Sequence, residues 1–236
     1  MTEKEIAVGL LRFAHRFLVR QTMPRYAVDY YDALIASVSD FYLRPFRDEV
    51  LGCFPSSATI LDIGTGPGHL PVMLAQANPA YRIVGVDLSE AVLRAARRRA
   101  ADAELSDQVE FRRVDIEKDA SDLPHADLAI SACSLHHWRY PVRMLRAISN
   151  LLKPGGQIWI LDDCGETSNE ARKAWVERVA RVANAGWVFR TVFRLESRYL
   201  AYTRSEFEAI CGKSALELVE FKCRDVFFLA KIRAAK

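Results

Sequence analysis

Residues 58–68 constrain the fold of this 236-residue chain more than any other stretch. The run from Ala58 to Ile63 is short, apolar and bounded by turn-forming residues, which is typical of a buried strand. Three glycines follow at every second position: Gly64, Gly66 and Gly68. Residues 69–77 then have the pattern of a helix. A strand that turns through glycines into a helix is the nucleotide-binding element of a doubly wound α/β sheet.

The spacing of the glycines indicates which ligand this turn suits. A dinucleotide-binding turn has the spacing G-x-G-x-x-G, whereas here Asp62 precedes Gly64 by two residues and the glycines alternate. Pyrophosphate is anionic and is held by helix N–H groups, so the carboxylate of Asp62 would repel it. The same carboxylate suits a ligand with an ammonium and a sulfonium group and no phosphate, which describes S-adenosylmethionine. Taken alone, the glycine turn is also compatible with a plain nucleotide site or a structural turn.

Residues 58–162 resemble the class I (Rossmann-like) S-adenosylmethionine-dependent methyltransferases. Asp62 and the glycines resemble the first motif of that family, and the stretch Ser134-Leu135-His136-His137-Trp138, with the later turn Lys153-Pro154-Gly155-Gly156, resembles its small-molecule (type 11/25-like) branch. The resemblance implies a doubly wound, seven-stranded, mostly parallel sheet. It also implies N-terminal helices and a helical insertion after the fifth strand.

Two further strands are predicted to end in acids. Asp87 closes the apolar run that starts at Tyr81, about 20 residues after the glycines, the interval at which a carboxylate accepts hydrogen bonds from ribose hydroxyls. Helix capping is the alternative role, although Ser89 is the better cap. Asp115 closes the next alternating run and would bind the adenine amine by the same resemblance; a turn-forming role is the alternative.

The predicted cofactor site consists of these acids and glycines together with adjacent residues. The resemblance places some of the adjacent residues beside the adenine and one at the end of the fourth strand. The site comprises Asp62, Gly64, Thr65, Gly66, Gly68, Asp87, Leu88, Asp115, Ile116 and Ser131. The predicted cofactor is S-adenosyl-L-methionine, with S-adenosyl-L-homocysteine as its product.

His136 and His137 are the candidate catalytic residues, because they follow the fourth strand at the point where the resemblance places the methyl group. Imidazole titrates near neutral pH, so either ring is able to take a proton from an attacking hydroxyl or amine. We prefer His136 slightly. The alternatives are that one histidine caps the following helix and the other only lines the pocket.

The end of the fourth strand excludes several branches of the resembled family. Ser131-Ala132-Cys133-Ser134 lacks the (Asn/Asp)-Pro-Pro-aromatic motif of enzymes that methylate exocyclic amines of nucleic acids, and the Pro-Cys nucleophile of cytosine C5 enzymes. The paired glutamates of arginine methyltransferases are absent as well. Magnesium-dependent enzymes need an acid where Ser131 stands, so no metal is expected.

The flanking regions are predicted to contribute the acceptor side. Residues 1–55 form a helical cap whose Tyr26 and Tyr30, with Tyr31, are candidates to cover the ligands; shared packing is the alternative. Residues 56–236 form the methyltransferase domain, with a substrate-lid insertion at 164–203. In that insertion, Trp187, Arg190 and Arg194 are candidates for binding an apolar, acidic acceptor, and a packing helix or dimer surface is the alternative.

Composition indicates where the protein is located and which partners it binds. Hydrophobic residues make up 50% of the chain, yet no apolar run reaches the ~20 residues of a membrane span, and the N-terminus does not resemble a signal peptide. Five scattered cysteines without a C-x-x-C pair favour reduced thiols and a cytoplasmic location over disulfides or zinc. A net charge of +3 makes a nucleic-acid partner unlikely, and the arginines at 94–99 fit a solvated helix face.

The predicted function is methyl transfer from S-adenosylmethionine to an O, N or C nucleophile of a small molecule, and a homodimer is compatible with the sequence. Two alternatives remain open: an RNA-modifying methyltransferase that uses the arginines, and a non-catalytic scaffold that retains the fold.

Overall fold

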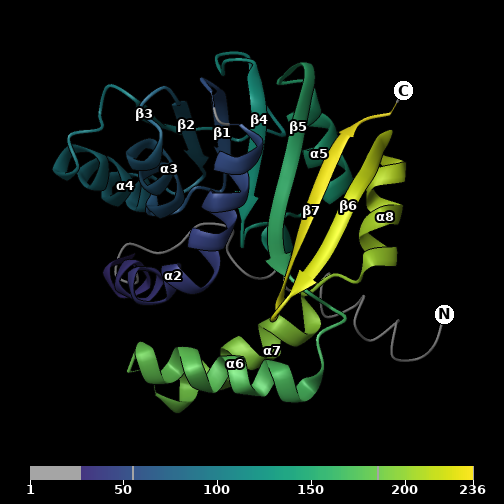
Figure 1. Cartoon of the computed structure of the whole chain (residues 1–236). Helices are drawn as coiled ribbons and strands as arrows, with labels where there is room; N and C mark the ends of the chain where they lie inside the picture. Colours follow the sequence, from purple (N-terminus) through teal and green to yellow (C-terminus); the bar gives the residue numbers. More distant parts are fainter. Residues whose placement is uncertain (1–27, 55, 185, 236) are drawn as a thin grey trace.

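The computed structural model describes residues 28–54, 56–184 and 186–235, with one sheet covered by helices (Figure 1). The strands are β1 (Thr59–Ile63), β2 (Arg82–Asp87), β3 (Val109–Arg113), β4 (Ala126–Ala132), β5 (Leu152–Asp163), β6 (Leu216–Arg224) and β7 (Phe227–Ala234). The helices are α2 (Val28–Cys53), α3 (His69–Ala77), α4 (Glu90–Asp102), α5 (Pro141–Ser149), α6 (Asn169–Val182), α7 (Trp187–Tyr199) and α8 (Arg204–Lys213), with the short 3-10 helix η2 (Leu135–His137).

The seven strands follow the order β3-β2-β1-β4-β5-β7-β6. All neighbours from β3 to β5 pair in parallel, whereas β7 runs antiparallel to both β5 and β6. The order reverses between β1 and β4, which is the switch point where such sheets bind ligands. The predicted doubly wound, seven-stranded, mostly parallel sheet is confirmed.

Both faces of the sheet are buried, because helices cover each of them. Successive side chains of a strand point to opposite faces. Ile60 of β1 packs on one side with residues of α2, α3 and α4, and its neighbour Leu61 packs on the other side with residues of α5 and α8. This double burial explains why the central strands are continuous apolar runs in the sequence.

The carboxyl ends of β1 to β5 meet at one edge of the sheet, and α6 and α7 lie beyond that edge (Figure 1). The predicted helical insertion after the fifth strand is therefore present, and the aromatic stretch from Trp187 forms the helix α7. The helix α8 begins with a capping box made by Thr203 and Glu206. Tyr26 and the first half of the predicted helical cap, residues 1–27, lie outside the described residues.

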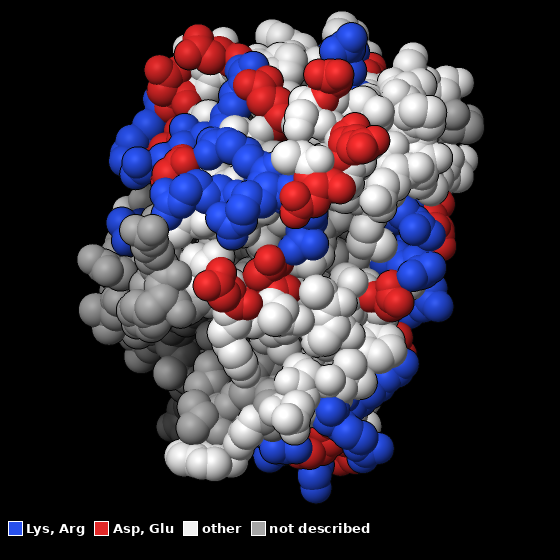
Figure 2. Space-filling view, turned by 90° about the vertical axis from the view of Figure 1, so that its left-hand side faces the viewer, with Lys and Arg blue, Asp and Glu red and all other residues white. Residues whose placement is uncertain are grey.

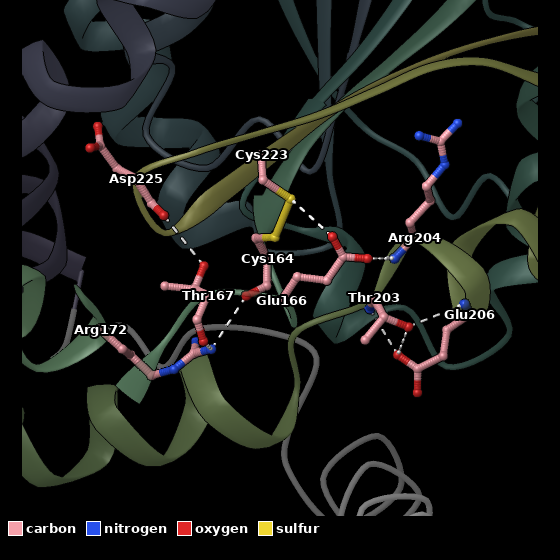
Figure 3. Close-up of a disulfide and its surroundings, with 9 residues drawn as sticks. All are labelled: Cys164, Glu166, Thr167, Arg172, Thr203, Arg204, Glu206, Cys223 and Asp225. Carbon is pink, nitrogen blue, oxygen red and sulfur yellow. Dashed lines mark hydrogen bonds between the residues drawn. A yellow bond between two sulfur atoms is a disulfide. The ribbon is translucent and has the colours of Figure 1, made fainter. Parts of the chain in front are cut away.

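One prediction about the cysteines is wrong. Cys164, directly after β5, and Cys223 on β6 form a disulfide across 59 residues, with their Cα atoms 6.3 Å apart (Figure 3). Three other cysteines are free: Cys53, Cys133 and Cys211. The pairing could not be predicted from spacing because β7 lies between β5 and β6 in the sheet, and only the observed register brings the two sulfur atoms together. No helix among the described residues combines the length and apolarity that crossing a membrane requires.

Candidate active site

The glycine turn is shaped by contacts that a side chain would prevent. Gly64, Gly66 and Gly68 have φ angles of 72°, 54° and 78°, in the region that favours glycine. A Cβ atom on Gly64 would lie 2.0 Å from Oγ of Ser134, which follows β4. The N–H groups of Gly64 and Thr65 both donate to the carbonyl of Val86, at 2.9 and 3.0 Å. The turn is thereby held between the ends of β2 and β4.

The surroundings of Gly66 are less crowded. A Cβ atom there would make an ordinary van der Waals contact with Cε1 of Tyr31, at 3.9 Å, so this α2 side chain lies against the turn. Tyr30, the predicted candidate beside it, is 58% exposed. Of these two tyrosines on α2, Tyr31 is the one that the structure brings to the glycine turn.

Asp87 joins the end of β2 to the glycine turn. One carboxylate oxygen accepts a hydrogen bond from the N–H of Gly66 at 3.1 Å, and the other accepts from the N–H of Ser89 at 2.8 Å. Ser89 occupies the N-cap position of α4 but its side chain makes no capping hydrogen bond. Asp87 thus binds the N–H at the start of α4, which is close to its alternative role, and its ribose contact stays a prediction. Burial raises the pKa of Asp87, and the hydrogen bonds oppose that rise.

Asp62 is buried at the end of β1, with 2% of its surface exposed. Its carboxylate accepts a hydrogen bond from the hydroxyl of Thr65 at 2.7 Å. Burial raises the pKa of Asp62 to about 7, the Thr65 hydrogen bond opposes the rise, and the charge of Asp87 adds to it. A buried carboxylate of this kind is stabilised in its ionised form when a cation comes close.

The other predicted cofactor residues lie at neighbouring strand ends. Asp115 pairs with Nζ of Lys118 at 2.9 Å and its carbonyl accepts from two following N–H groups, so it also forms the turn that was its alternative role. Ile116 is buried, and the carbonyl of Leu88 accepts a hydrogen bond from Arg113 at 3.1 Å. The buried hydroxyl of Ser131 donates to the carbonyl of Ile63 at 2.9 Å and ties β4 to β1.

His136 is paired with a carboxylate that we did not predict as a catalytic partner. Its Nδ1 lies 2.8 Å from Oδ1 of Asp162, near the end of β5, and the N–H of Asp163 donates to the same oxygen at 2.8 Å. Asp162 is fully buried, and its other oxygen has no hydrogen-bond partner within the described part of the chain. The ring of His137 lies 4.0 Å from that of His136. One sequence feature could have pointed to this partner: Asp162 lies near the end of β5, the strand that pairs with β4.

Two groups of metal-ligand side chains occur among the described residues. In the first group the sulfur atoms of Cys164 and Cys223 are already joined, beside Glu166. The second group consists of His136, Asp162 and Asp163, in which His136 Nδ1 and Asp162 Oδ1 are already paired with each other. In each group, two of the three residues are thus already paired with each other.

The acceptor residues predicted in the insertion face other parts of the insertion or solvent. Arg190 and Arg194 both pair with Glu177 of α6, at 3.1 and 3.3 Å, and Trp187 is 76% exposed. These contacts fit the alternative role of α7 as a packing helix. The buried guanidinium of Arg172 donates to the carbonyls of Cys164 and Thr167 in the loop after β5 (Figure 3). It also donates to the carbonyl of Ser197 and so connects this loop to α7.

The arginines of α4 and β3 are largely engaged within the protein. Figure 2 shows the face on which α4 lies, where a band of basic side chains is bordered by acidic ones. Three of these arginines form ion pairs: Arg97 with Glu90, Arg99 with Asp32, and Arg112 with Glu110. This pairing fits a solvated helix face.

The fold and these strand-end acids define a class I, Rossmann-like methyltransferase. A family model described as "Methyltransferase domain" matches residues 55–208, and the chain belongs to this family. Two solved structures share the fold. A methyltransferase from Aquifex aeolicus has a TM-score of 0.66 and 17% identity, covering 89% of this chain and 98% of that one. The plantazolicin methyltransferase BpumL, solved with a substrate analogue and S-adenosylhomocysteine, has a TM-score of 0.68 and 15% identity, covering 99% and 98%.

Curated relatives match parts of the chain. A 27-O-demethylrifamycin SV methyltransferase of Amycolatopsis mediterranei is 30% identical over 65% of this chain and 56% of its own length. A ubiquinone biosynthesis O-methyltransferase of Nitrosococcus oceani is 28% identical over 75% of this chain and 71% of its own length. A trans-aconitate 2-methyltransferase of Variovorax paradoxus is 33% identical over 56% of this chain and 49% of its own length. The matches to the first and third thus span about half of each relative.

Proposed function

We propose that this protein transfers a methyl group from S-adenosylmethionine to an O, N or C nucleophile of a small molecule. Membership of the methyltransferase-domain family supports the reaction, and the names of the matched relatives, which specify a rifamycin, ubiquinone biosynthesis and trans-aconitate, support a small acceptor. The ion pairs of Arg97, Arg99 and Arg112 with acidic side chains give the RNA-modifying alternative no support.

The strand ends fit the cofactor. Tyr31 lies against the glycine turn, and the adjacent carboxylates of Asp62 and Asp87 suit an ammonium group and ribose hydroxyls. Leu88, Asp115 and Ile116 would border the adenine. When bound, S-adenosylmethionine supplies an electrophilic methyl group on a sulfonium. The remaining catalytic task of the chain is to align the acceptor and to remove its proton.

The contact between His136 and Asp162 is the observation that carries the mechanism. A carboxylate facing Nδ1 favours the proton on that nitrogen and leaves Nε2 to accept another. Asp162 is fully buried, so its charge is stabilised chiefly by the imidazole and by the N–H of Asp163. We therefore assign His136 as the general base for an acceptor hydroxyl or amine, Asp162 as its positioning residue, and His137 as a residue that lines the site.

Substitution of the histidines tests this assignment. His136→Gln should lower kcat by roughly 10²–10⁴-fold, the usual contribution of general acid–base catalysis, because glutamine cannot take up the proton. The variant should bind S-adenosylmethionine normally, and its pH–rate profile should lose the limb due to the imidazole. His137→Gln is the matched control and should change kcat only a few-fold. If both variants turn over like the parent, catalysis here depends on alignment alone.

We further propose how the chain is organised: a helical cap at 1–55, a methyltransferase domain at 56–236 and, within it, an insertion at 164–203 that borders the acceptor. We also propose that the protein is cytoplasmic and forms a homodimer. The position of α6 and α7 beyond the carboxyl edge of the sheet supports a lid role, although the ion pairs of Arg190 and Arg194 leave that role to other residues of the insertion (Figure 1).

A further inference from the structure

A cavity of about 380 Å³ lies between α2 and the hairpin of β6 and β7. Its apolar walls come from α2, β5 and β7: Phe41, Tyr42, Phe46, Leu161, Phe227 and Leu229. The volume falls in the lower part of the ~300–1,000 Å³ range of ligand pockets, which are typically lined by apolar and aromatic side chains. None of the residues assigned to the cofactor site lines this cavity.

The walls of the cavity are aromatic and fixed. The rings of Tyr42 and Phe227 lie 5.2 Å apart, and both residues are more than nine-tenths buried. Trp175 of α6 contacts both Phe41 and Phe227 from behind, with centroid distances of 5.9 and 5.3 Å. Such walls favour a flat, ring-shaped ligand, because aromatic pairs gain from offset or edge contacts beyond simple burial.

The charged residues that line the cavity balance one another. They comprise two cations and two anions: Lys222, Arg224, Glu49 and Asp225. Lys222 pairs with Glu220, and Glu49 pairs with Lys231 at 2.6 Å, so these charges are neutralised locally. Because the charges of the lining residues cancel, the cavity attracts neither an acidic nor a basic ligand. Its lining therefore fits a neutral ligand.

The cavity adjoins the methyl-transfer edge of the sheet. The carbonyl of Leu161, in its wall, accepts a hydrogen bond at 2.8 Å from the N–H of Cys133, at the end of β4. Asp163 follows Leu161 by two residues and so lies on the same face of β5, and a carboxylate oxygen of Asp163 lies within 4.8 Å of a ring nitrogen of His136. Tyr42 is close enough to Cys133 and Asp163 for their charges to raise its pKa, in addition to the larger effect of burial. The disulfide fixes Cys223, another wall residue, to the loop after β5 (Figure 3).

We propose that this cavity receives the neutral, flat, apolar ring system of the methyl acceptor. The inference rests on the proposed methyl transfer and adds the substrate class: an aromatic or polycyclic molecule whose nucleophile reaches the His136–Asp162 pair while its ring body lies between α2 and the β6–β7 hairpin.

The test uses 2-naphthol as the probe and ¹⁹F NMR of the full chain labelled with 5-fluorotryptophan. The probe should shift the resonance of Trp175, behind the cavity wall, in a saturable way and leave that of the exposed Trp187 unchanged. Leu229→Phe fills the cavity and should weaken binding at least tenfold. Val219→Phe, an exposed position on β6, is the matched control and should bind like the parent. 2-Naphthoate and a naphthylmethylammonium ion should both bind more weakly than the neutral probe.

Further measurements separate the inference from the proposed function. Calorimetry with S-adenosylhomocysteine shows whether Leu229→Phe is folded, since that variant should bind the product normally. Naphthol binding should persist with the product bound, and the histidine NMR signal of His136 should move while that of the exposed His125 does not. If 2-naphthol does not bind, or is displaced by the product, the inference fails and methyl transfer stands. If Trp175 moves without His136, the pocket holds a remote effector and the acceptor assignment is overturned. If the product itself does not bind, the proposed function falls.

Discussion

The carboxyl ends of β1 and β2 are held together by residues close in the sequence, whereas the region around β5, β6 and β7 is held together by residues far apart. On the first side, Asp62 bonds to Thr65 three positions later, and Asp87 bonds to Gly66 across 21 positions. On the second side, the disulfide spans 59 positions and the ion pair of Lys231 with Glu49 spans 182. We call these regions the cofactor side and the acceptor side.

This difference fits the tasks proposed for the two sides. The cofactor is the same molecule in every reaction cycle, so the same short turn and strand-end acids always suit it, and a local motif provides both. An acceptor site must suit one particular molecule, and its shape is set by long-range contacts that a few substitutions change. Changes on the acceptor side should therefore affect stability and acceptor binding, and changes on the cofactor side should affect cofactor binding.

Removing the disulfide should have the largest effect. Closing a loop of 59 residues stabilises a protein by about 4 kcal/mol in the chain-entropy model, so Cys223→Ser should lower the free energy of unfolding by up to that amount. Denaturant titration measures the change, and calorimetry should show the affinity for S-adenosylhomocysteine within about twofold of the parent. Cys53→Ser, at an exposed free cysteine, is the control and should change neither quantity. A parent protein whose stability does not respond to a reducing agent would contradict the prediction.

A methyl group at the glycine turn should affect the cofactor side. Gly64→Ala places a Cβ atom 2.0 Å from Ser134 Oγ and should weaken binding of S-adenosylhomocysteine by about 3 kcal/mol, because the turn must move. Gly155→Ala has a similar positive φ of 81° but open space around it, so it isolates the backbone strain of roughly 1–2 kcal/mol and should bind normally. Equal affinities in both variants would show that the turn does not contact the cofactor.

Asp87→Ala should have a somewhat smaller effect. Loss of charge-assisted hydrogen bonds to the ribose costs roughly 1.5–3 kcal/mol of binding free energy for S-adenosylhomocysteine. Asp127→Ala is the control, since this carboxylate pairs with Lys153 away from the glycine turn. Because Asp87 also holds the N–H groups of Gly66 and Ser89, circular dichroism must show that the variant is folded. An unchanged dissociation constant in the folded variant argues against the ribose assignment.

The pKa of Asp62 gives the smallest predicted effect, a pH dependence. Its folded-state value of about 7 exceeds the ~3.9 of an unfolded aspartate, so this group favours the folded state most at low pH. That contribution is lost as the pH rises from about 4 to 7 and is constant above. The affinity for cationic S-adenosylmethionine should change in the opposite direction, rising by up to tenfold per pH unit until about pH 7, because the ionised carboxylate attracts the ligand. Calorimetry across this range should show a flat profile for Asp62→Asn.

The two sides also differ in how far the sequence predicts them. The sheet, the glycine turn and the acids Asp62, Asp87 and Asp115 follow from short patterns, since buried strands and tight turns each have a local signature. The partnership of His136 with Asp162 depends on the parallel register of β4 with β5, which no local pattern reveals. The disulfide was missed for the same reason. The exposure of Tyr30 and Trp187 shows that an aromatic residue in the right segment need not face the site.

A crystal structure of the complex with S-adenosylhomocysteine tests the central claim most directly, because the claim is that these strand ends hold the cofactor with its sulfur facing the His136–Asp162 pair. The account predicts ribose hydroxyls within hydrogen-bonding distance of the Asp87 carboxylate, the amino group beside Asp62, and the sulfur directed towards His136. A product molecule bound away from the glycine turn, or bound there with its sulfur directed away from His136, would contradict it.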